Sequence, residues 1–157
     1  MSKSWDALVA LEALLLANLS PTTTLKDASI GLIEDMFHEN KFGGNLPFAA
    51  VEWRGDSELS EGPDDSDEDP IVPFIATIVV LDKSDSSKEN RRAKIETAMA
   101  HVPMIRNIVE GDLTLGGNAI DYFTKVGDSR MSDRVPSPFW AVEVDVQISV
   151  REVAGSR

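Results

Sequence analysis

The sequence predicts an α+β domain in which helices pack on one face of an antiparallel or mixed sheet of about four strands. Two patterns support this fold class. Apolar residues recur at helical spacing in several segments, and Val, Ile and Phe are concentrated in extended runs, of which WAVEVDVQISVRE is the clearest. The chain has 157 residues, 42% of them apolar and 27% charged, which is typical of a single domain. We place this domain at residues 1–157, with an acidic insertion at residues 55–70.

A first helix is expected over residues 4–19. Ser4 is the expected N-cap, and Asp6 suits the positive end of the helix dipole. The apolar side chains recur at helical spacing: Trp5, Leu8, Leu11 and Leu15. The segment also resembles a signal peptide, but Asp6 and Glu12 interrupt its apolar run and no small-residue cleavage pattern follows. We therefore expect a core helix.

A second helix is expected from about residue 25 to residue 40. Thr24 with Asp27 three positions later resembles a capping box, and Gly43 and Gly44 provide a stop. The expected apolar stripe consists of Leu25, Ala28, Leu32 and Met36.

Two strands are expected next, LPFAAVEWR at residues 46–54 and IVPFIATIVVLD at residues 71–82. The second is apolar on both faces, as in a central strand that is covered on both sides. Between them, GDSELSEGPDDSDEDP at residues 55–70 contains eight acidic residues and no basic one. This acidic stretch is expected to be a long loop joining the two strands.

A third helix is expected at residues 87–102 and is ended by Pro103. Its inward side chains are expected to be Ile95, Ala98, Met99 and Val102. Residues 121–126 are interpreted as a strand and residues 127–138, GDSRMSDRVPSP, as a loop.

The final strand alternates strictly. Its buried face is expected to hold Trp140, Val142, Val144, Val146, Ile148 and Val150, and its wet face Ala141, Glu143, Asp145, Gln147, Ser149 and Arg151. A strand of about eleven residues spans roughly 35 Å, whereas a domain of this length has a radius of gyration of about 15 Å. Part of this strand is therefore expected to lie against a neighbouring subunit.

The net charge of −12 is concentrated in the acidic stretch, and the rest of the chain is close to neutral. This distribution argues against a nucleic-acid-binding surface, which would be basic. The chain has no cysteine, so disulfides, thiolate nucleophiles and cysteine-based zinc sites are excluded. No apolar run reaches the ~20 residues that a membrane-spanning helix requires.

No catalytic, cofactor-binding or metal-binding residue is predicted. The acidic stretch has dense carboxylates but lacks the central glycine and the terminal glutamate of a calcium loop, so a solvated loop is preferred. His38 has no partner at ligand spacing and is expected at the surface. His101 is expected near the C-terminal end of the third helix, where the dipole favours an imidazolium and a structural role is sufficient. Glu143 and Asp145 share one strand face, but no nucleophile accompanies them, so solubility explains them better than acid–base catalysis.

A basic cluster opens the third helix, where cations oppose the helix dipole. Lys88, Arg91 and Arg92, together with Arg151, are the candidate partner interface, with Lys94 as a further member of the cluster. An acidic partner, or the chain's own acidic stretch, would suit it. The alternative is a solvated face, partly offset by Glu89.

The order of these segments resembles the tail terminator family of long-tailed bacteriophages. The similar features are a leucine-rich N-terminal helix, a strand ending in VEWR, the run FIATIVVLDK, the helix RRAKIETAMAHV, the segment TLGGNAIDYFTKV and the closing strand AVEVDVQISV. The resemblance covers residues 5–152. The acidic insertion matches no feature of the family.

The resemblance implies a structural virion protein rather than an enzyme. Six copies would form a ring on the completed tail tube, stop its polymerisation and join it to the head. The implied partners are the tail tube protein on one face and the head connector protein on the other, with DNA passing through without specific binding and no contact with a membrane.

Three alternatives stay open. A head–tail connector or completion protein shares the ring but contacts the head. An acidic inhibitor that mimics DNA would use the carboxylates directly, although it would spread them over a folded face rather than concentrate them in one segment. A small enzyme would need a pocket of converging polar groups, which the sequence does not indicate.

Overall fold

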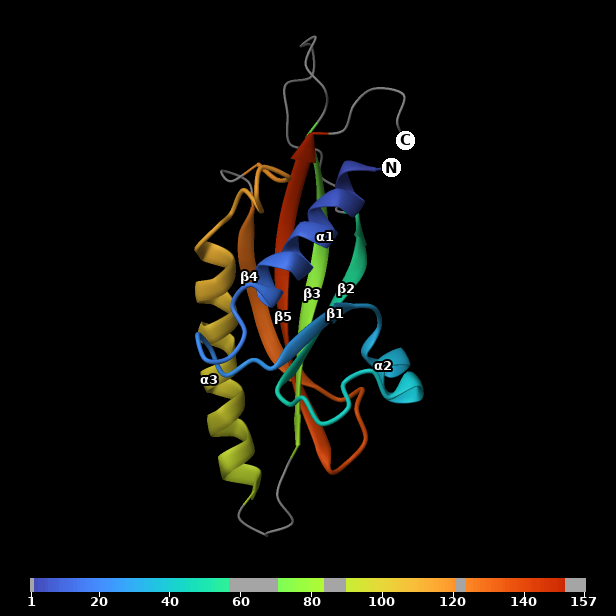
Figure 1. Cartoon of the computed structure of the whole chain (residues 1–157), viewed down its shortest axis with the longest axis vertical. Coiled ribbons are helices and arrows are strands. Elements are labelled where there is room, and N and C mark those ends of the chain that lie inside the picture. Colours follow the sequence, from blue (N-terminus) through green and yellow to red (C-terminus); the bar gives the residue numbers. More distant parts are fainter. Residues whose placement is uncertain (1, 57–70, 84–89, 121–123, 152–157) are drawn as a thin grey trace.

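Five strands form one sheet in the order β1-β2-β3-β5-β4 in the computed structural model (Figure 1). The structure describes residues 2–56, 71–83, 90–120 and 124–151. The strands are β1 (Asp27–Ile30), β2 (Phe48–Asp56), β3 (Ile71–Lys83), β4 (Lys125–Ser132) and β5 (Phe139–Arg151). β1 pairs with β2 in parallel, and every other neighbouring pair is antiparallel. The predicted α+β class with a mixed sheet is confirmed, with one strand more than expected. The acidic stretch from residue 57 to residue 70 lies outside the described residues.

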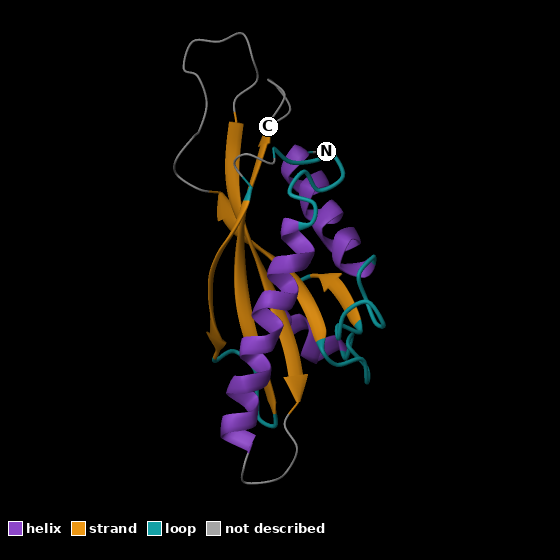
Figure 2. Ribbon diagram, turned by 90° about the vertical axis from the view of Figure 1, so that its left-hand side faces the viewer, coloured by secondary structure: helices purple, strands orange, loops and turns teal. Residues whose placement is uncertain are grey.

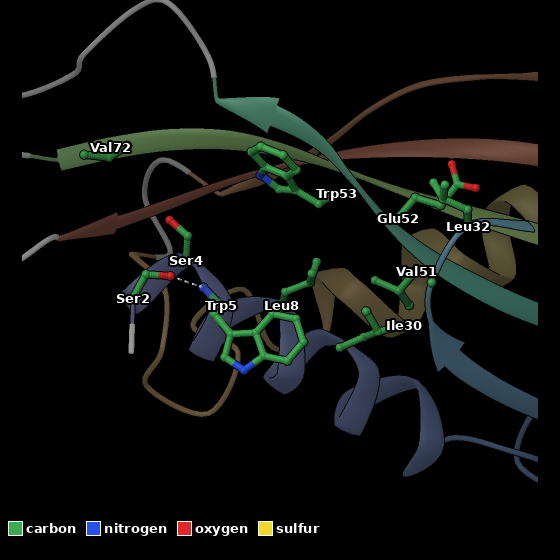
Figure 3. Close-up of a pocket in the computed structure, with 11 residues that line it drawn as sticks. Ser2, Ser4, Trp5, Leu8, Ile30, Leu32, Val51, Glu52, Trp53 and Val72 are labelled. Atoms are coloured by element: carbon green, nitrogen blue, oxygen red, sulfur yellow. Dashed lines mark hydrogen bonds between the residues drawn. The ribbon is translucent and has the colours of Figure 1, made fainter. Parts of the chain in front are cut away.

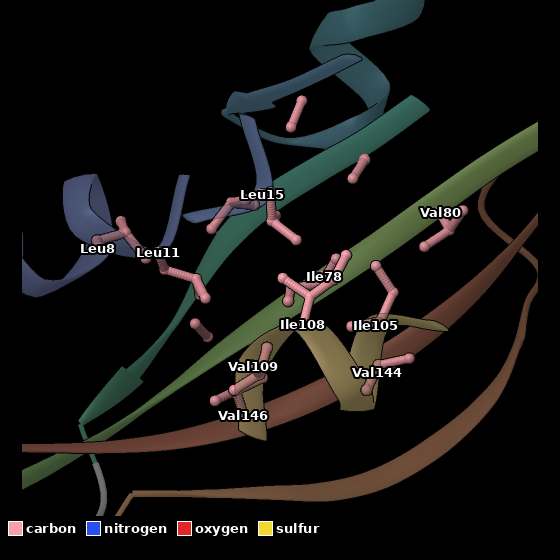
Figure 4. Packing of buried hydrophobic residues seen from close by; sticks show 14 of the residues in the cluster. Leu8, Leu11, Leu15, Ile78, Val80, Ile105, Ile108, Val109, Val144 and Val146 are labelled. Carbon is pink, nitrogen blue, oxygen red and sulfur yellow. The ribbon is translucent and has the colours of Figure 1, made fainter. Parts of the chain in front are cut away.

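Two long helices, α1 (Lys3–Leu16) and α3 (Asn90–Glu110), cover one face of the sheet (Figure 2). The main core lies between these helices and the sheet (Figure 4). It includes Leu8, Leu11, Leu15, Ile78, Val80, Ile105, Ile108, Val109, Val144 and Val146. None of the helices in the described part of the chain is long and apolar enough to cross a membrane.

A smaller core lies on the opposite face of the sheet, so the prediction that the helices pack on one face holds for α1 and α3 but not for α2. The short helix α2 (Ile33–Glu39) contributes Ile33 and Met36 to it, and they pack with Phe48, Val79 and other buried residues. Phe37 contacts Phe42 and Phe139 edge to face, with ring centroids 5.2 and 5.0 Å apart. β3 is therefore covered on both faces over its second half, as its apolar sequence predicts.

The helix predicted at residues 4–19 is present as α1, but its cap was assigned to the wrong serine. Ser2, not Ser4, is the N-cap, and its hydroxyl oxygen accepts a hydrogen bond of 3.0 Å from the Trp5 amide. Moving the cap by two residues starts the helix at Lys3.

The helix predicted at residues 25–40 is wrong in its first half. Residues 27–30 form β1, and the Asp27 carboxylate accepts a bond from the next amide, that of Ala28, instead of capping a helix. Gly31 follows with φ of 146°, a conformation that favours glycine and turns the chain out of the strand. Only the segment after this glycine is helical, as α2.

β5 is matched residue for residue by β3, since Phe139–Arg151 pairs with Ile71–Lys83 along its whole length. The chain therefore provides an equally long partner for this strand, so its length by itself does not require a neighbouring subunit.

The predicted wet face of β5 is also largely wrong. Ala141, Glu143 and Ser149 are buried, while Asp145 and Gln147 are half-buried. The smaller core covers Ala141, and arginines from β4 and the segment after it cover Glu143.

α3 continues through Pro103 to Glu110, so the proline does not end it. Losing one helix hydrogen bond and straining one turn costs about 3 kcal/mol. The residues beyond the proline offset this cost, because burying Ile105, Ile108 and Val109 contributes roughly 1.5–3 kcal/mol each.

The buried face of α3 also differs from the prediction. It is formed by Ala98, His101, Ile105, Ile108 and Val109. In contrast, Ile95 and Met99 are exposed and Val102 is half-buried. The apolar pattern was misleading because one core position is a histidine.

Part of the loop predicted at residues 127–138 is a strand, since β4 extends from Lys125 to Ser132. The strand predicted at residues 121–126 therefore begins late, and residues 121–123 lie outside the described part. β4 has few apolar residues because it is an exposed edge strand. The register of its pairing with β5 shifts between Val126 and Ser129. This irregularity and the charged side chains of β4 protect the exposed edge of the sheet from pairing with a strand of another molecule.

Candidate functional site

An apolar groove of about 680 Å³ opens between the first turns of α1 and the second half of β2 (Figure 3). Trp5 from α1 and Trp53 from β2 form opposite walls, and Leu8 and Val51 lie between them. Trp53 is 56% exposed, Leu32 46% and Trp5 44%. Three large apolar side chains thus lie exposed around one concavity, which is unusual unless a partner covers them.

The groove exists because β1 is short. β1 pairs only with Phe48–Val51, so no described strand lies beside the remainder of β2 on that side. Gly31 then turns the chain away from β2 toward α2, and a Cβ at this position would lie 2.6 Å from the Met36 Cε atom. The turn leaves the wall between Trp5 and Trp53 uncovered.

A second exposed apolar surface lies on α3. We call it the α3 stripe and define it by Arg92, Ile95, Met99, Pro103 and Arg106, which recur at helical spacing on the side away from the core. Ile95 is 53% and Met99 69% exposed. The stripe has an apolar middle and a basic residue near each end.

A buried ionic cluster joins α2, β2 and the segment after β4. The Glu52 side chain is fully buried, and its carboxylate binds the Arg134 guanidinium through both oxygens. It also accepts a 2.9 Å bond from the Ile33 amide at the start of α2. Arg134 donates a further bond of 2.8 Å to Glu34. The hydrogen bond with Glu52, followed by the one with Glu34, raises the pKa of Arg134 above its ordinary value, although burial acts in the opposite direction.

A second ionic cluster lies on β4 and β5. Arg130 binds Glu143 and Asp145, each at 2.8 Å, and Thr77 donates a 2.8 Å bond to Asp145. Burial tends to raise the pKa of Asp145, but the hydrogen bonds from Arg130 and Thr77 and the nearby positive charges lower it below its ordinary value. Glu143 and Asp145 are therefore held by a cation, which is an arrangement for structure rather than for proton transfer.

His101 is a buried structural residue in the middle of α3. Its Nε2 atom lies 3.0 Å from a carboxylate oxygen of Asp82 on β3, and its ring stacks on Trp140 with centroids 5.8 Å apart. The predicted place near the end of the helix is wrong because α3 is longer than expected. His38, in the last turn of α2, is exposed, as expected.

The described members of the candidate partner interface do not lie in one patch. Lys88 and the Arg91 side chain lie outside the described residues, Arg92 is exposed near the start of α3, and Lys94 is half-buried. Arg151 is the last residue of β5, and Figure 1 shows that α3 starts at the opposite end of the molecule from the end of β5. Arg92 alone among them belongs to the α3 stripe.

The residues that sequence reasoning missed are Glu52, Arg134 and the groove tryptophans. One signal could have indicated the first: Glu52 shares a strand face with Phe48 and Ala50, so alternation places it in a core where it requires a cation. No comparable signal indicated that the tryptophans line a groove. Within the described residues, no group of three or more His, Asp or Glu could hold a metal ion.

No family model matches the sequence, and a search of curated proteins finds no match.

Proposed function

We propose that this chain is a tail terminator of a long-tailed bacteriophage, which forms a ring on the tail tube, stops its polymerisation and joins it to the head. The observation that supports the proposal best is the pair of exposed apolar surfaces. The groove lies at β2 and the N-terminal end of α1, whereas α3, the helix that carries the α3 stripe, lies at the other side of the sheet, beside β4 (Figure 1). Two different surfaces on one subunit suit a head-to-tail contact, which gives a closed ring when its rotation closes.

The chemistry of the described side chains is consistent with a structural role. The carboxylates that could have formed an acid–base pair bind arginines, and His101 is buried against Asp82 and Trp140. We therefore propose that the protein is not an enzyme and that it resides in the virion, at the junction of tail and neck. A net charge of −12 disfavours adhesion of DNA, because like charges repel.

A phage that lacks this protein tests the proposal. A terminator is required to stop the tube, so its loss should give tails of irregular and excessive length, visible by negative-stain electron microscopy. In the wild-type particle, the protein should be present as a ring of six copies at the head-proximal end. A head–tail connector would instead give tails of normal length that fail to join heads. Absence of the protein from purified virions would contradict both proposals and favour a free inhibitor or enzyme.

A further inference from the structure

We propose that the α3 stripe of one copy inserts into the Trp5–Trp53 groove of the next copy, so that these two surfaces form the subunit contact. This inference rests on the proposed ring, and it assigns the residues that make the ring.

The shapes of the two surfaces are complementary. The groove is concave, with Trp5 and Trp53 on its walls and Leu8 at its base (Figure 3). Ile95 and Met99 project from one side of a helix, about 6 Å apart along its axis. Binding of two apolar side chains, one helical turn apart, in an apolar groove is a recurrent mode of helix recognition.

The charges also agree. On the stripe, Arg92 and Arg106 flank Ile95 and Met99. α3 as a whole contains Arg91, Arg92, Lys94 and Arg106 against Glu96 and Glu110, of which Arg106 and Glu110 form an ion pair at 4.0 Å. The elements around the groove are acidic. α1, β1, α2 and β2 contain Asp6, Glu12, Asp27, Glu34, Asp35, Glu39, Glu52 and Asp56 against Lys3 and Arg54. Glu34, which also pairs with Arg134, and Asp35 are exposed in the first turn of α2, close in sequence to Leu32 of the groove. Opposite signs favour this pairing and disfavour groove-to-groove or helix-to-helix pairing of two copies.

One copy can make both contacts at once. The stripe and the groove share no residue, and α3, which carries the stripe, lies beside β4 and away from β2 (Figure 1). A stripe-to-groove contact therefore leaves one free stripe and one free groove until the ring closes.

Cysteine cross-linking tests the contact, because the natural chain has no cysteine and each engineered pair reports one proximity. Leu32→Cys in the groove and Met99→Cys in the stripe are made singly and together. The variants are assembled on tail tubes and treated with a short bismaleimide. We expect a mixture of the Leu32→Cys and Met99→Cys single variants to give a covalent dimer. The double variant should give a ladder of cross-linked oligomers up to the closed ring. Neither single variant should cross-link by itself. Met131→Cys, an exposed residue of β4, is the control and should not cross-link to Leu32→Cys.

A second variant measures the energy of the contact. Met99→Asp leaves the core intact because Met99 is 69% exposed, so circular dichroism should be unchanged. Its incorporation on tail tubes should fall by about tenfold or more, which is the loss expected when one apolar side chain is removed from an interface. Met131→Asp should incorporate normally.

The outcomes separate the contact from the function. A ring in the tails without cross-linking between residues 32 and 99 would overturn the contact and leave the terminator proposal intact. Cross-linking of Leu32→Cys to itself would overturn it in favour of a symmetric pair. Cross-linking of this residue to another tail protein would show that the groove binds a different partner. Absence of any ring from tails would overturn both proposals.

Discussion

Arg134 binds both carboxylate oxygens of Glu52, a residue 82 positions earlier in the chain that is almost completely buried. The same carboxylate accepts a hydrogen bond from the Ile33 amide and so fixes the start of α2. One ion pair therefore holds together β2, α2 and the segment that connects β4 to β5.

Replacing Arg134 by methionine should lower the free energy of unfolding by about 3 kcal/mol, because it leaves a buried carboxylate without its main cation. Urea denaturation followed by circular dichroism measures this change. Arg92→Met is the matched control, since Arg92 is exposed, and it should change stability by no more than about 0.5 kcal/mol. Equal stability of the two variants would show that the ion pair contributes little.

Removing both charges should be less harmful than removing one. The double variant Glu52→Leu, Arg134→Met has no unpaired buried charge, although the Ile33 amide loses its acceptor. We expect it to recover at least about 1 kcal/mol relative to Arg134→Met alone, in the same denaturation experiment. A double variant less stable than the single variant would contradict this account.

Substitution by aspartate should prevent folding on the buried face of α3 and be tolerated on its exposed face. Ile105 is completely buried, so Ile105→Asp introduces an unpaired carboxylate into the core and should prevent folding. Ile95 is 53% exposed, so Ile95→Asp should leave a folded protein with stability within about 1 kcal/mol of the wild type. Circular dichroism and size-exclusion chromatography distinguish the two results. Loss of folding in Ile95→Asp would mean that the assigned helix face is wrong.

The Asp145 cluster should make stability fall in acid. Its folded-state pKa is lowered, so the carboxylate stabilises the fold above its unfolded value of about 3.9. This contribution is lost as the pH falls through the lower folded-state value. The urea midpoint of the wild type should therefore fall between about pH 5 and pH 2, and that of Asp145→Asn should fall less steeply. Identical slopes would contradict the assignment.

The structure and the sequence pattern lead to different expectations for the effect of replacing Glu143 on stability. On a wet face its replacement would be almost silent, but the carboxylate is buried and binds Arg130 at 2.8 Å. Glu143→Ala should therefore lower stability by about 1–2 kcal/mol. Gln147→Ala, at a half-buried position on the same strand face, is the comparison and should have the smaller effect.

The strands were predictable where the apolar pattern was strong. β3 and β5 follow directly from IVPFIATIVVLD and from the alternation that begins at Trp140. β1 could not be recognised from its sequence, because four residues are too few to show an alternating pattern. The one local indication was Gly31, which interrupts the predicted helix. β4 was missed because an exposed edge strand requires few apolar residues.

The candidate surfaces could not be predicted because they depend on tertiary contacts. Trp5 was assigned to the buried stripe of the first helix, and its exposure follows from where β1 ends. Ile95 and Met99 were assigned inward because His101, a polar residue, occupies a core position through its bond to Asp82. Sequence spacing shows which residues share a face but not which face is covered.

The full-length pairing of β3 with β5 has a mechanical consequence. Thirteen residues of each strand lie side by side, so the pair is a ribbon about 43 Å long that follows the long axis of the molecule (Figure 1). Its hydrogen bonds run perpendicular to the strands. Tension that pulls β3 and β5 past each other along this axis therefore loads many bonds in shear at the same time, and the ribbon cannot open one bond after another. A force applied along the strands is resisted by the whole length of the sheet, which makes this axis the stiff direction of the protein.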